Sequence, residues 1–500
     1  MINKLEVNTN LIKKYPRDML KEYRLLPAYV EENKLVLYCE KRPPLTILDS
    51  LQVYGGRRIT LNKISGEELD ILLNEYLDAP LDTVEEMLND LNNDNINDFT
   101  SIELDLKTEN LEELAQEAPV IRLVNAILTS GLKKNASDIH IEPFEDSLKL
   151  RFRIDGVLYA EPAPPRELFP AIITRIKIMA RMNIAERRLP QEGRIRIKVL
   201  GREVDIRVSC TPTLYGESVV LRILDRAAYL LELENLGFRD DMLINYRNLV
   251  NIPHGILLVT GPTGSGKTTT LYATLNELNI PGKKIITVED PVEYQLDGVN
   301  QIQVKPEIDF SFARGLRSIL RQDPDIIMIG EIRDVETAKI AIQAALTGHL
   351  VLATLHTNDA ASAITRLINM GVEEYLLAAT IKGVLAQRLV RVLCPDCRRK
   401  DDIKKDKYDR YISEENKSQG FYTAVGCDNC NDIGYKNRLG IYELLTITED
   451  LEELIIKNAS ANSIKNMAIK DGFKDLMTDG LLKAGEGITS LDEIIRVTKN

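Results

Sequence analysis

A glycine-rich stretch near the middle of the chain has the residue types and spacing of a phosphate-binding loop. It reads Gly-Pro-Thr-Gly-Ser-Gly-Lys-Thr over residues 261–268 and fits the pattern G-x-x-x-x-G-K-[ST]. Glycines let the backbone curl round a phosphate, so that consecutive N–H groups face the anion. The pattern predicts that Lys267 reaches the β- and γ-phosphates and that the Thr268 hydroxyl binds Mg²⁺. A glycine-rich turn without a ligand is the alternative.

The residues on either side of this loop favour the first interpretation. The apolar run at 256–259 is long enough for a buried parallel strand, and residues 269–275 have the pattern of a helix start. A strand, a loop and a helix in this order place the loop at a helix N-terminus, which attracts anions. We therefore expect a nucleoside-triphosphate site formed by Gly261, Pro262, Thr263, Gly264, Ser265, Gly266, Lys267, Thr268 and Thr269.

Polar side chains follow three later apolar runs. One run ends in Glu289 and Asp290, with Glu293 close behind, the next is followed by Glu331, and the third by His356. Because the carboxyl ends of parallel strands form the ligand crevice of an open α/β sheet, these residues are expected beside the loop. Glu331 can polarise an attacking water or hold Mg²⁺ through water, and His356 can sense the γ-phosphate. A solvent-facing acid and a structural histidine are the alternatives.

Four of the six cysteines form two C-x-x-C pairs, Cys394 with Cys397 and Cys427 with Cys430. Two such pairs about thirty residues apart can present four thiolates tetrahedrally, as in structural zinc sites. A redox dithiol needs one pair, and neither pair lies between a strand and a helix as in thioredoxin-like motifs. A Zn²⁺ site is predicted, with redox-active or unpaired thiols as alternatives.

A second group of strand-like segments precedes the phosphate loop. These segments alternate apolar and polar residues with period two, and arginines such as Arg207 and Arg222 occupy polar positions. A row of arginines on a strand face is more often solvated surface. The phosphate loop weakens that interpretation, because oligomeric ATPases place such cations against the γ-phosphate of a neighbour.

The composition of the chain limits its class. A chain of 500 residues is too long to fold around a single hydrophobic core, so several domains are expected. Its content of 44% hydrophobic and 28% charged residues is typical of a globular protein. A net charge of −12 without a long basic run argues against nucleic acid as the main partner. No apolar run approaches the ~18 residues of a membrane span, and the N-terminus lacks the apolar core of a signal peptide. A cytosolic protein is expected.

The C-terminal part of the sequence gives less distinct signals. From Ala378 the pattern predicts a helix that leads into the first cysteine pair, and the highly charged segment at 401–417 is expected to be exposed. Residues 440–445 and the apolar-periodic segments up to Val497 predict a helical subdomain.

Five motifs, in order, resemble those of the ATPases that power type II secretion and type IV pilus assembly. The resemblance extends from about residue 115 to the end, and the cysteine module is characteristic of the same branch. Glu192 replaces the aspartate of the family's Leu-Pro-Gln-Asp-Gly-Arg signature. The motifs are that signature at 188–194, Walker A at 261–268, an Asp box at 288–294, Walker B at 321–334 and a His box at 347–358.

The resemblance implies an α/β fold with a RecA-like P-loop ATPase core, a PAS-like α+β second domain, a small N-terminal α+β domain and a zinc-bound C-terminal subdomain. The implied limits are an adaptor domain at 1–90, a linker at 91–110, the PAS-like domain at 111–232, the ATPase domain at 233–390, the zinc module at 391–435 and the helical subdomain at 436–500.

The resemblance also implies roles for individual residues. Arg207 and Arg222 match arginine fingers that approach the γ-phosphate, Glu331 matches the residue that activates water, and Lys267 binds phosphate. The implied catalytic residues are Glu331, Lys267, Arg207, Arg222, Glu289 and His356, with Asp290 and Glu293 supporting the Mg²⁺ and water network. The expected cofactors are ATP, Mg²⁺ and Zn²⁺.

The assembly implied by the resemblance is a homohexamer on the cytoplasmic face of the inner membrane. Its N-terminal domain docks on a bitopic membrane protein, and a polytopic platform protein is the second partner. The chain length favours type II secretion, with pilus extension or a competence pseudopilus as the alternative. The acidic balance and 5% aromatic content disfavour a DNA-translocating motor. A non-hydrolysing scaffold would predict loss of Lys267 or Glu331, and both are present.

Overall fold

The computed structural model describes residues 114–199, 202–224, 232–400 and 420–499, together with Leu111 and a discontinuous set between residues 7 and 73. The chain divides into two compact units, residues 1–224 and 225–500. The predicted linker at 91–110 and the charged segment at 401–417 lie outside the described residues, so both stay predictions.

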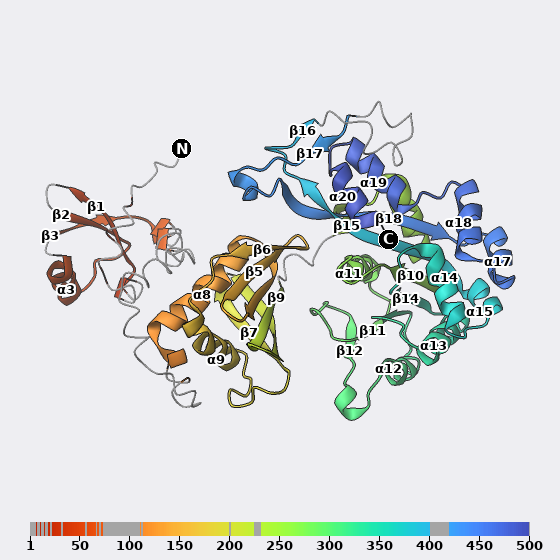
Figure 1. Ribbon diagram of the computed structural model, residues 1–500, viewed down its shortest axis with the longest axis horizontal. Coiled ribbons are helices and arrows are strands. Elements are labelled where there is room, and N and C mark those ends of the chain that lie inside the picture. Colours follow the sequence, from red (N-terminus) through yellow and green to blue (C-terminus); the bar gives the residue numbers. More distant parts are fainter. Residues whose placement is uncertain are drawn as a thin grey trace. The chain divides into compact units, whose positions relative to one another are not determined.

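The first unit begins with a small three-stranded sheet of order β1-β2-β3 (Figure 1). β1 and β2 pair antiparallel, whereas β2 and β3 pair parallel because helix α3 connects them. Buried side chains such as Leu26, Leu37 and Leu51 form its core. The elements are β1 (Leu25–Glu31), β2 (Lys34–Cys39), α3 (Leu45–Gly55) and β3 (Arg58–Lys63). The α+β character expected of this region is confirmed for its described residues.

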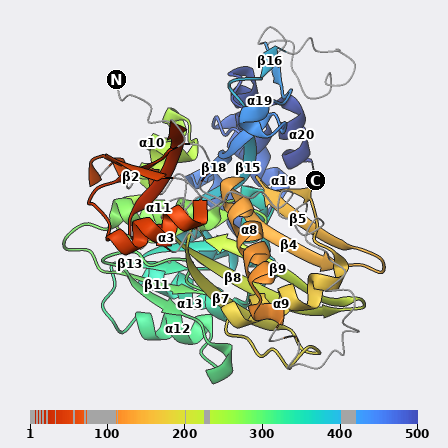
Figure 2. The ribbon, with the colours of Figure 1, turned by 90° about the vertical axis from the view of Figure 1, so that its left-hand side faces the viewer.

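The second part of the first unit is a six-stranded antiparallel sheet of order β6-β5-β4-β9-β8-β7. Its strands alternate as predicted: on β5, Leu150 and Phe152 are buried, whereas Arg151 and Arg153 are not. α8 and α9 contact each other and the sheet (Figure 2). The elements are α8 (Ala118–Lys133), β4 (Ala136–Pro143), β5 (Leu148–Ile154), β6 (Val157–Glu161), η1 (Arg166–Leu168), α9 (Phe169–Met179), β7 (Gln191–Val199), β8 (Arg202–Thr213) and β9 (Gly216–Leu224).

The second unit is organised around a seven-stranded sheet of order β12-β11-β13-β14-β10-β15-β18. All neighbours run parallel except β15 and β18, which are antiparallel. β10, β13 and β14 are buried along their whole length, which explains their continuous apolar sequences. The strands are β10 (Gly255–Thr260), β11 (Ile285–Glu289), β12 (Asn300–Gln303), β13 (Ile326–Ile329), β14 (Leu350–Leu355), β15 (Ile381–Leu393) and β18 (Tyr435–Thr446).

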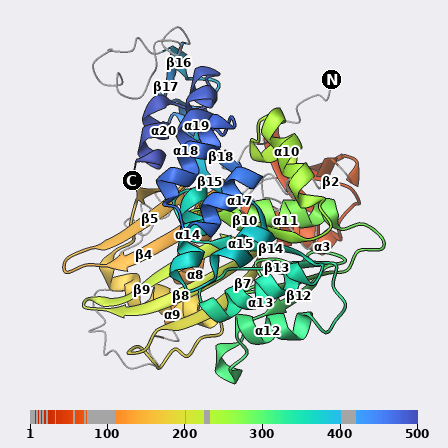
Figure 3. The same cartoon turned by 90° about the vertical axis from the view of Figure 1, so that its right-hand side faces the viewer.

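Helices cover both faces of this sheet (Figure 3). α10 and α11 contribute to the core on one face, and α12 to α15 with α17 and α18 contribute to the core on the other. The helices are η3 (Leu233–Leu236), α10 (Asp240–Val250), α11 (Lys267–Leu278), η4 (Pro306–Ile308), α12 (Phe312–Ile319), α13 (Val335–Leu346), α14 (Ala360–Asn369), α15 (Glu374–Thr380), α17 (Glu449–Ile456), α18 (Ala461–Lys470), α19 (Leu476–Gly485) and α20 (Leu491–Thr498).

Two sequence-based expectations for the C-terminal part are wrong. The helix expected from Ala378 ends at Thr380, and the following residues form β15. Residues 440–445, expected to be helical, lie within β18 and pair with β15. The first strand is buried on both faces where it joins the sheet, so its apolar residues show no alternation that would distinguish a strand from a helix.

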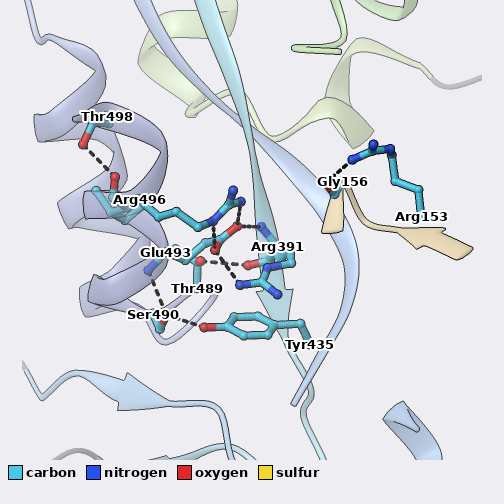
Figure 4. A network of polar contacts seen from close by, with 10 residues as sticks. Arg153, Gly156, Arg391, Tyr435, Thr489, Ser490, Glu493, Arg496 and Thr498 are labelled. Carbon is cyan, nitrogen blue, oxygen red and sulfur yellow. Dashed lines mark hydrogen bonds and ion pairs between the residues drawn. The ribbon is translucent and has the colours of Figure 1, made fainter. Parts of the chain in front are cut away.

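A buried carboxylate fastens α20 to β15 (Figure 4). Both oxygens of Glu493 accept hydrogen bonds from Arg496, at 2.8 and 2.6 Å, and from Arg391, whose backbone N–H and Nη2 lie at 3.0 and 2.9 Å. The Arg391 guanidinium also lies over the ring of Tyr435, whose hydroxyl bonds to Ser490. Burial alone would raise the pKa of Glu493, but the hydrogen bonds from Arg496 and Arg391 outweigh it and lower the pKa to about 2.

Replacing Glu493 by Gln tests this network. The substitution removes the negative charge that pairs with the guanidinium groups of Arg391 and Arg496. We therefore expect the free energy of unfolding to fall by about 3 kcal/mol at pH 7. The stabilisation by the wild-type carboxylate is present above its ordinary pKa of 4.5 and is lost as the pH falls through about 2. Urea denaturation at pH 7 and pH 2 measures both effects, with the exposed Glu453→Gln as control. Equal stability of the two variants at pH 7 would contradict the network.

Candidate active site and metal centre

The phosphate loop joins β10 to α11 at the carboxyl edge of the second unit's sheet. α11 begins at Lys267, so the strand–loop–helix order expected from the sequence is confirmed. Gly261, Gly264 and Gly266 have positive φ angles of 148°, 79° and 89°, which side-chain-bearing residues rarely adopt. The loop therefore ends at a helix N-terminus, where free N–H groups and the helix dipole favour an anion.

Lys267 lies largely buried beneath the loop backbone. Its Nζ donates hydrogen bonds to the carbonyl oxygens of Gly261, at 2.8 Å, and Pro262, at 3.1 Å. Burial lowers the pKa of Lys267 to about 8, although the negative charge of Glu331 acts against this shift. An anion bound at the loop would raise this pKa again, because it favours the charged form of the lysine.

The remaining residues of the predicted loop differ in exposure. Thr263 and Gly264 are exposed at its tip, whereas Ser265 is buried. Thr268 and Thr269 are half-buried on the first turn of α11. The arrangement leaves the tip and the first helical turn accessible to a ligand, with the lysine between them.

Gln387 of β15 supports the loop from the neighbouring strand. β15 runs parallel to β10, and the buried Nε2 of Gln387 donates to the carbonyl oxygen of Ser265 at 2.8 Å. A Cβ at Gly261 would lie 2.5 Å from the carbonyl oxygen of Gln387, so the loop packs directly on this strand. The sequence pattern gives no signal for Gln387, because it predicts a helix where β15 forms.

Glu331, Arg333 and His356 lie together where β13 and β14 end. Nη2 of Arg333 lies 2.5 Å from one oxygen of Glu331, and Nε2 of His356 lies 3.4 Å from the other. The Glu331 side chain is 14% exposed and that of His356 49% exposed. Burial lowers the pKa of His356, and the positive charge of Lys267 lowers it further. The imidazole is therefore mainly neutral at pH 7 and can donate or accept a hydrogen bond.

The three acids of the predicted Asp box have different surroundings. Glu289 is buried and accepts hydrogen bonds from the Tyr272 hydroxyl, from Thr287 at 2.6 Å and from Gln301 at 3.1 Å. These donors come from α11, β11 and β12, so the carboxylate joins three elements, and burial raises its pKa. This geometry is that of a positioning residue, and a direct catalytic role for Glu289 stays a prediction.

Asp290 is exposed, whereas Glu293 is half-buried. Asp290 lies 3.9 Å from Arg333, the residue that also pairs with Glu331. Asp290 therefore belongs to the same group of charges as Glu331. The predicted contribution of Glu293 to Mg²⁺ binding stays a prediction.

The polar face of the first unit's six-stranded sheet carries a row of arginines. Arg207 is directly opposite Arg222 on one side and Arg194 on the other, Arg222 is opposite Asp138, and Asp138 is opposite Arg153. Directly opposed residues point to the same face of a sheet. Asp138 accepts a hydrogen bond from Arg222 at 2.9 Å, and Arg153 lies 3.8 Å from its other oxygen. The row thus places four guanidinium groups and one carboxylate next to one another on this face.

The four paired cysteines converge on one point after the end of β15. Their Sγ atoms all lie within 4.8 Å of one another. Three separations are 3.9 Å for Cys394 and Cys427, 3.8 Å for Cys397 and Cys430, and 3.7 Å for Cys427 and Cys430. A tetrahedral ion with Zn–S bonds of about 2.3 Å separates its sulfurs by about 3.8 Å, so the arrangement is compatible with zinc.

Backbone N–H groups support the same centre. Gly426 donates to Cys397 at 3.4 Å and Gly434 to Cys430 at 3.1 Å. Burial alone would raise the pKa of Cys430, but hydrogen bonds from Gly434 and Cys427 outweigh it and lower the pKa to about 7. These donors favour the thiolate of Cys430, the form that binds metal, whereas burial raises the pKa of Cys394 and raises that of Cys427 to about 12.

The site and the sheet together define the class of protein. A mainly parallel sheet with helices on both faces, a phosphate loop at its carboxyl edge, and an acid after β13, which β14 separates from the strand of the loop, are the features of a RecA-like P-loop ATPase. The structure is similar to the crystal structure of the pilus retraction motor PilT with bound ADP, with 26% identity, a TM-score of 0.52 and coverage of 75% of this chain and 94% of that one.

The sequence comparisons place the chain within this class. The sequence profile described as "Type II/IV secretion system protein" matches residues 113–496, and the chain belongs to this family. The Type II secretion system ATPase E of Vibrio cholerae is 48% identical over 440 residues, 88% of this chain and 87% of that protein. The type IV pilus assembly ATPase PilB of Myxococcus xanthus is 43% identical over 506 residues, 98% of this chain and 87% of that protein. The family resemblance found in the motifs is confirmed.

Replacing Gln387 by Ala tests whether β15 supports the phosphate loop. Because a buried hydrogen bond to the loop is lost, we expect ADP affinity, measured by titration calorimetry, to fall about tenfold. The exposed Gln343→Ala on α13 is the matched control and should bind ADP as the wild type does. Unchanged affinity in the folded Gln387→Ala variant would show that the loop keeps its shape without this contact.

Metal analysis of the purified protein tests the cysteine centre. We expect one zinc ion per chain in the wild type and almost none in Cys427→Ser, because three thiolates bind zinc far more weakly than four. Cys210→Ala, which changes a buried cysteine on β8, should keep the metal. Wild-type protein without zinc but with oxidised cysteine pairs would favour the redox alternative.

Proposed function

We propose that this protein is the hexameric ATPase motor of a type II secretion system and drives pseudopilus assembly by hydrolysing ATP. The observation that carries the proposal is the position of Lys267 in the phosphate loop, within electrostatic reach of Glu331 and its partners Arg333 and His356. A phosphate-binding cation and a held carboxylate at one edge of a parallel sheet are what hydrolysis of a phosphoanhydride requires.

In this proposal the loop N–H groups and Lys267 bind the β- and γ-phosphates of ATP. The Thr268 hydroxyl would hold Mg²⁺ with support from Asp290 and Glu293, and the ion would neutralise the charge that develops on the phosphates. Thr269 extends the contacts along the first helical turn. The substrate is thereby fixed in place before any bond is broken, which reduces the entropic part of the barrier.

Glu331 is the proposed residue that activates the attacking water. Its carboxylate accepts a hydrogen bond from that water and increases its nucleophilicity, while Arg333 and His356 fix the orientation of the two oxygens. Glu289 contributes by keeping β11, β12 and α11 in register around the site. His356, neutral at pH 7, donates a hydrogen bond that reports the presence of the γ-phosphate.

Arg207 and Arg222 are the proposed arginine fingers. The guanidinium groups of their row would neutralise charge on the γ-phosphoryl group during transfer. Loss of the γ-phosphate removes that attraction, so the domain that carries the row is released after each turnover. Repeated around a ring of six subunits, attraction and release supply the motion that a motor needs.

The other parts of the chain are proposed to connect this motor to its machinery. The N-terminal domain docks on a bitopic inner-membrane protein, and the ring acts on a polytopic platform protein. Among the described residues, no helix is long and apolar enough to cross a membrane. We propose a location on the cytoplasmic face of the inner membrane, with peripheral or indirect membrane contact, and a structural role for Zn²⁺.

Type IV pilus assembly is the second candidate. It is favoured by the similarity to PilB, which extends over 98% of this chain. Complementation of secretion-deficient and pilus-deficient strains distinguishes the two: we expect restored secretion of exported proteins, whereas restored pili alone would favour the alternative.

Turnover as a function of protein concentration tests the motor. We expect ATP hydrolysis per subunit to rise as rings assemble and to fall at least 100-fold in Glu331→Gln, which keeps nucleotide affinity because the phosphate loop is intact. The exposed Glu453→Gln is the control and should match the wild type. Negligible hydrolysis at every concentration, with hexamers formed, would contradict the proposal and favour a nucleotide-binding scaffold.

A further inference from the structure

One row of residues runs from the phosphate loop across β15 to the edge strand β18. Thr260, the last residue of β10, is opposite Ala386, and Ala386 is opposite Glu443. The side chains of Thr260 and Glu443 therefore share a face of the sheet, two strands or about 10 Å apart, with only a methyl group between them. This face lies on the side covered by α14.

The two outer members of this row hold the segment that follows β14. Thr260 Oγ1 accepts a hydrogen bond from the backbone N–H of Thr357 at 3.0 Å and bonds to its hydroxyl at 2.8 Å. Glu443 accepts a hydrogen bond at 2.6 Å from the backbone N–H of Ala360, the first residue of α14. His356 directly precedes the first of these anchors, so the segment that carries it is fixed at both ends.

A third contact on the same face holds the middle of the segment. Arg388 lies two residues after Ala386 on β15, and its Nη2 donates to Oδ1 of Asn358 at 3.2 Å. Three adjacent strands thus each contribute one side chain to the positioning of residues 356–360.

The second oxygen of Glu443 belongs to a different part of the chain. It accepts a hydrogen bond at 3.1 Å from the backbone N–H of Leu476, the first residue of α19. α19 is fastened to β18 at two further points, since Asp479 accepts from the Tyr442 N–H at 2.9 Å and Lys483 donates to the Gly440 carbonyl at 2.8 Å. One carboxylate therefore joins the N-termini of α14 and α19.

The Glu443 carboxylate is buried, and burial of a charged group is energetically unfavourable unless hydrogen bonds compensate for the lost contact with water. The residue is 2% exposed, and burial raises its pKa to about 7, although the N–H groups of Ala360 and Leu476 act against the shift. A carboxylate in such a place is destabilising unless both oxygens are bonded, and the positive ends of two helix dipoles favour its charge.

We propose that Glu443 is a positioning residue for ATP hydrolysis: it holds the loop that carries His356 beside Glu331 and links that loop to the C-terminal helix α19. A displacement of α19 would reach the nucleotide site through this one side chain. The effect on turnover rests on the proposed ATPase function, whereas the effect on the loop does not.

Hydrogen exchange and kinetics of Glu443→Gln test this role in the full-length protein. A glutamine offers one acceptor oxygen for two N–H donors, so one helix must lose its partner. We expect amide exchange of residues 356–362 to rise about tenfold without nucleotide, and kcat to fall about tenfold with ADP affinity changed less than twofold. The exposed Glu453→Gln on α17 of the same unit is the control, and it should leave the exchange of residues 356–362 and kcat within twofold of the wild type.

Each outcome has a defined meaning. Unchanged exchange at 356–362 in a folded variant would overturn the proposal whether or not the protein hydrolyses ATP, and raised exchange with unchanged kcat would overturn the role in hydrolysis. If wild-type protein shows no turnover, the proposed function fails while the exchange result still decides whether Glu443 holds the loop. Should Glu443→Gln not fold, Glu443→Asp keeps the charge but is too short to reach both helices, and the same rise in exchange is expected.

Discussion

The second unit depends on one constraint: a backbone loop must present its N–H groups to an anion at the end of a strand that is buried on both faces. Three positive φ angles at Gly261, Gly264 and Gly266 create the curl, and the close approach of Gln387 leaves no room for a side chain at Gly261. The strand that precedes the loop must be central, because only a central strand has neighbours whose ends can supply the other polar groups.

Buried carboxylates hold the elements around this loop together. Glu289 joins α11, β11 and β12, Glu443 joins α14 and α19, and Glu493 joins α20 to β15. An ionised group inside a protein is destabilising by several kcal/mol unless it is fully hydrogen-bonded, so each contact tolerates little displacement. Apolar packing allows neighbouring helices to slide, whereas such bonds define one relative position. The surroundings of the nucleotide site are therefore specified more strictly than hydrophobic contact alone would allow.

The sequence is most informative where function needs a fixed local pattern. The phosphate loop, the apolar strands that end in Glu331 and His356, and the four cysteines are all found from residue type and spacing. β15 and β18 cannot be found in this way. β15 is buried on both faces near the sheet, so its sequence shows no alternation, and its partner β18 lies beyond the cysteine module in the chain. The orientation of the Glu289 side chain likewise depends on hydrogen bonds from Tyr272 and Gln301, which belong to other elements of the chain. Contacts of this kind form only in the folded chain, so they cannot be predicted from a local sequence pattern.

The long pair of β15 and β18 has a mechanical consequence. β15 pairs with β10 only as far as Ala386 but continues to Leu393, where it reaches Cys394 and the cysteine centre. Beyond the sheet the two strands form a ribbon that is closed at its tip by four sulfurs and covered along its side by α19 and α20. A ribbon held at one end by a sheet and at the other by the cluster of four cysteines resists bending. Force applied at the tip would be transmitted along the strands to Gln387 and Glu443 as in a rigid lever, without being absorbed on the way.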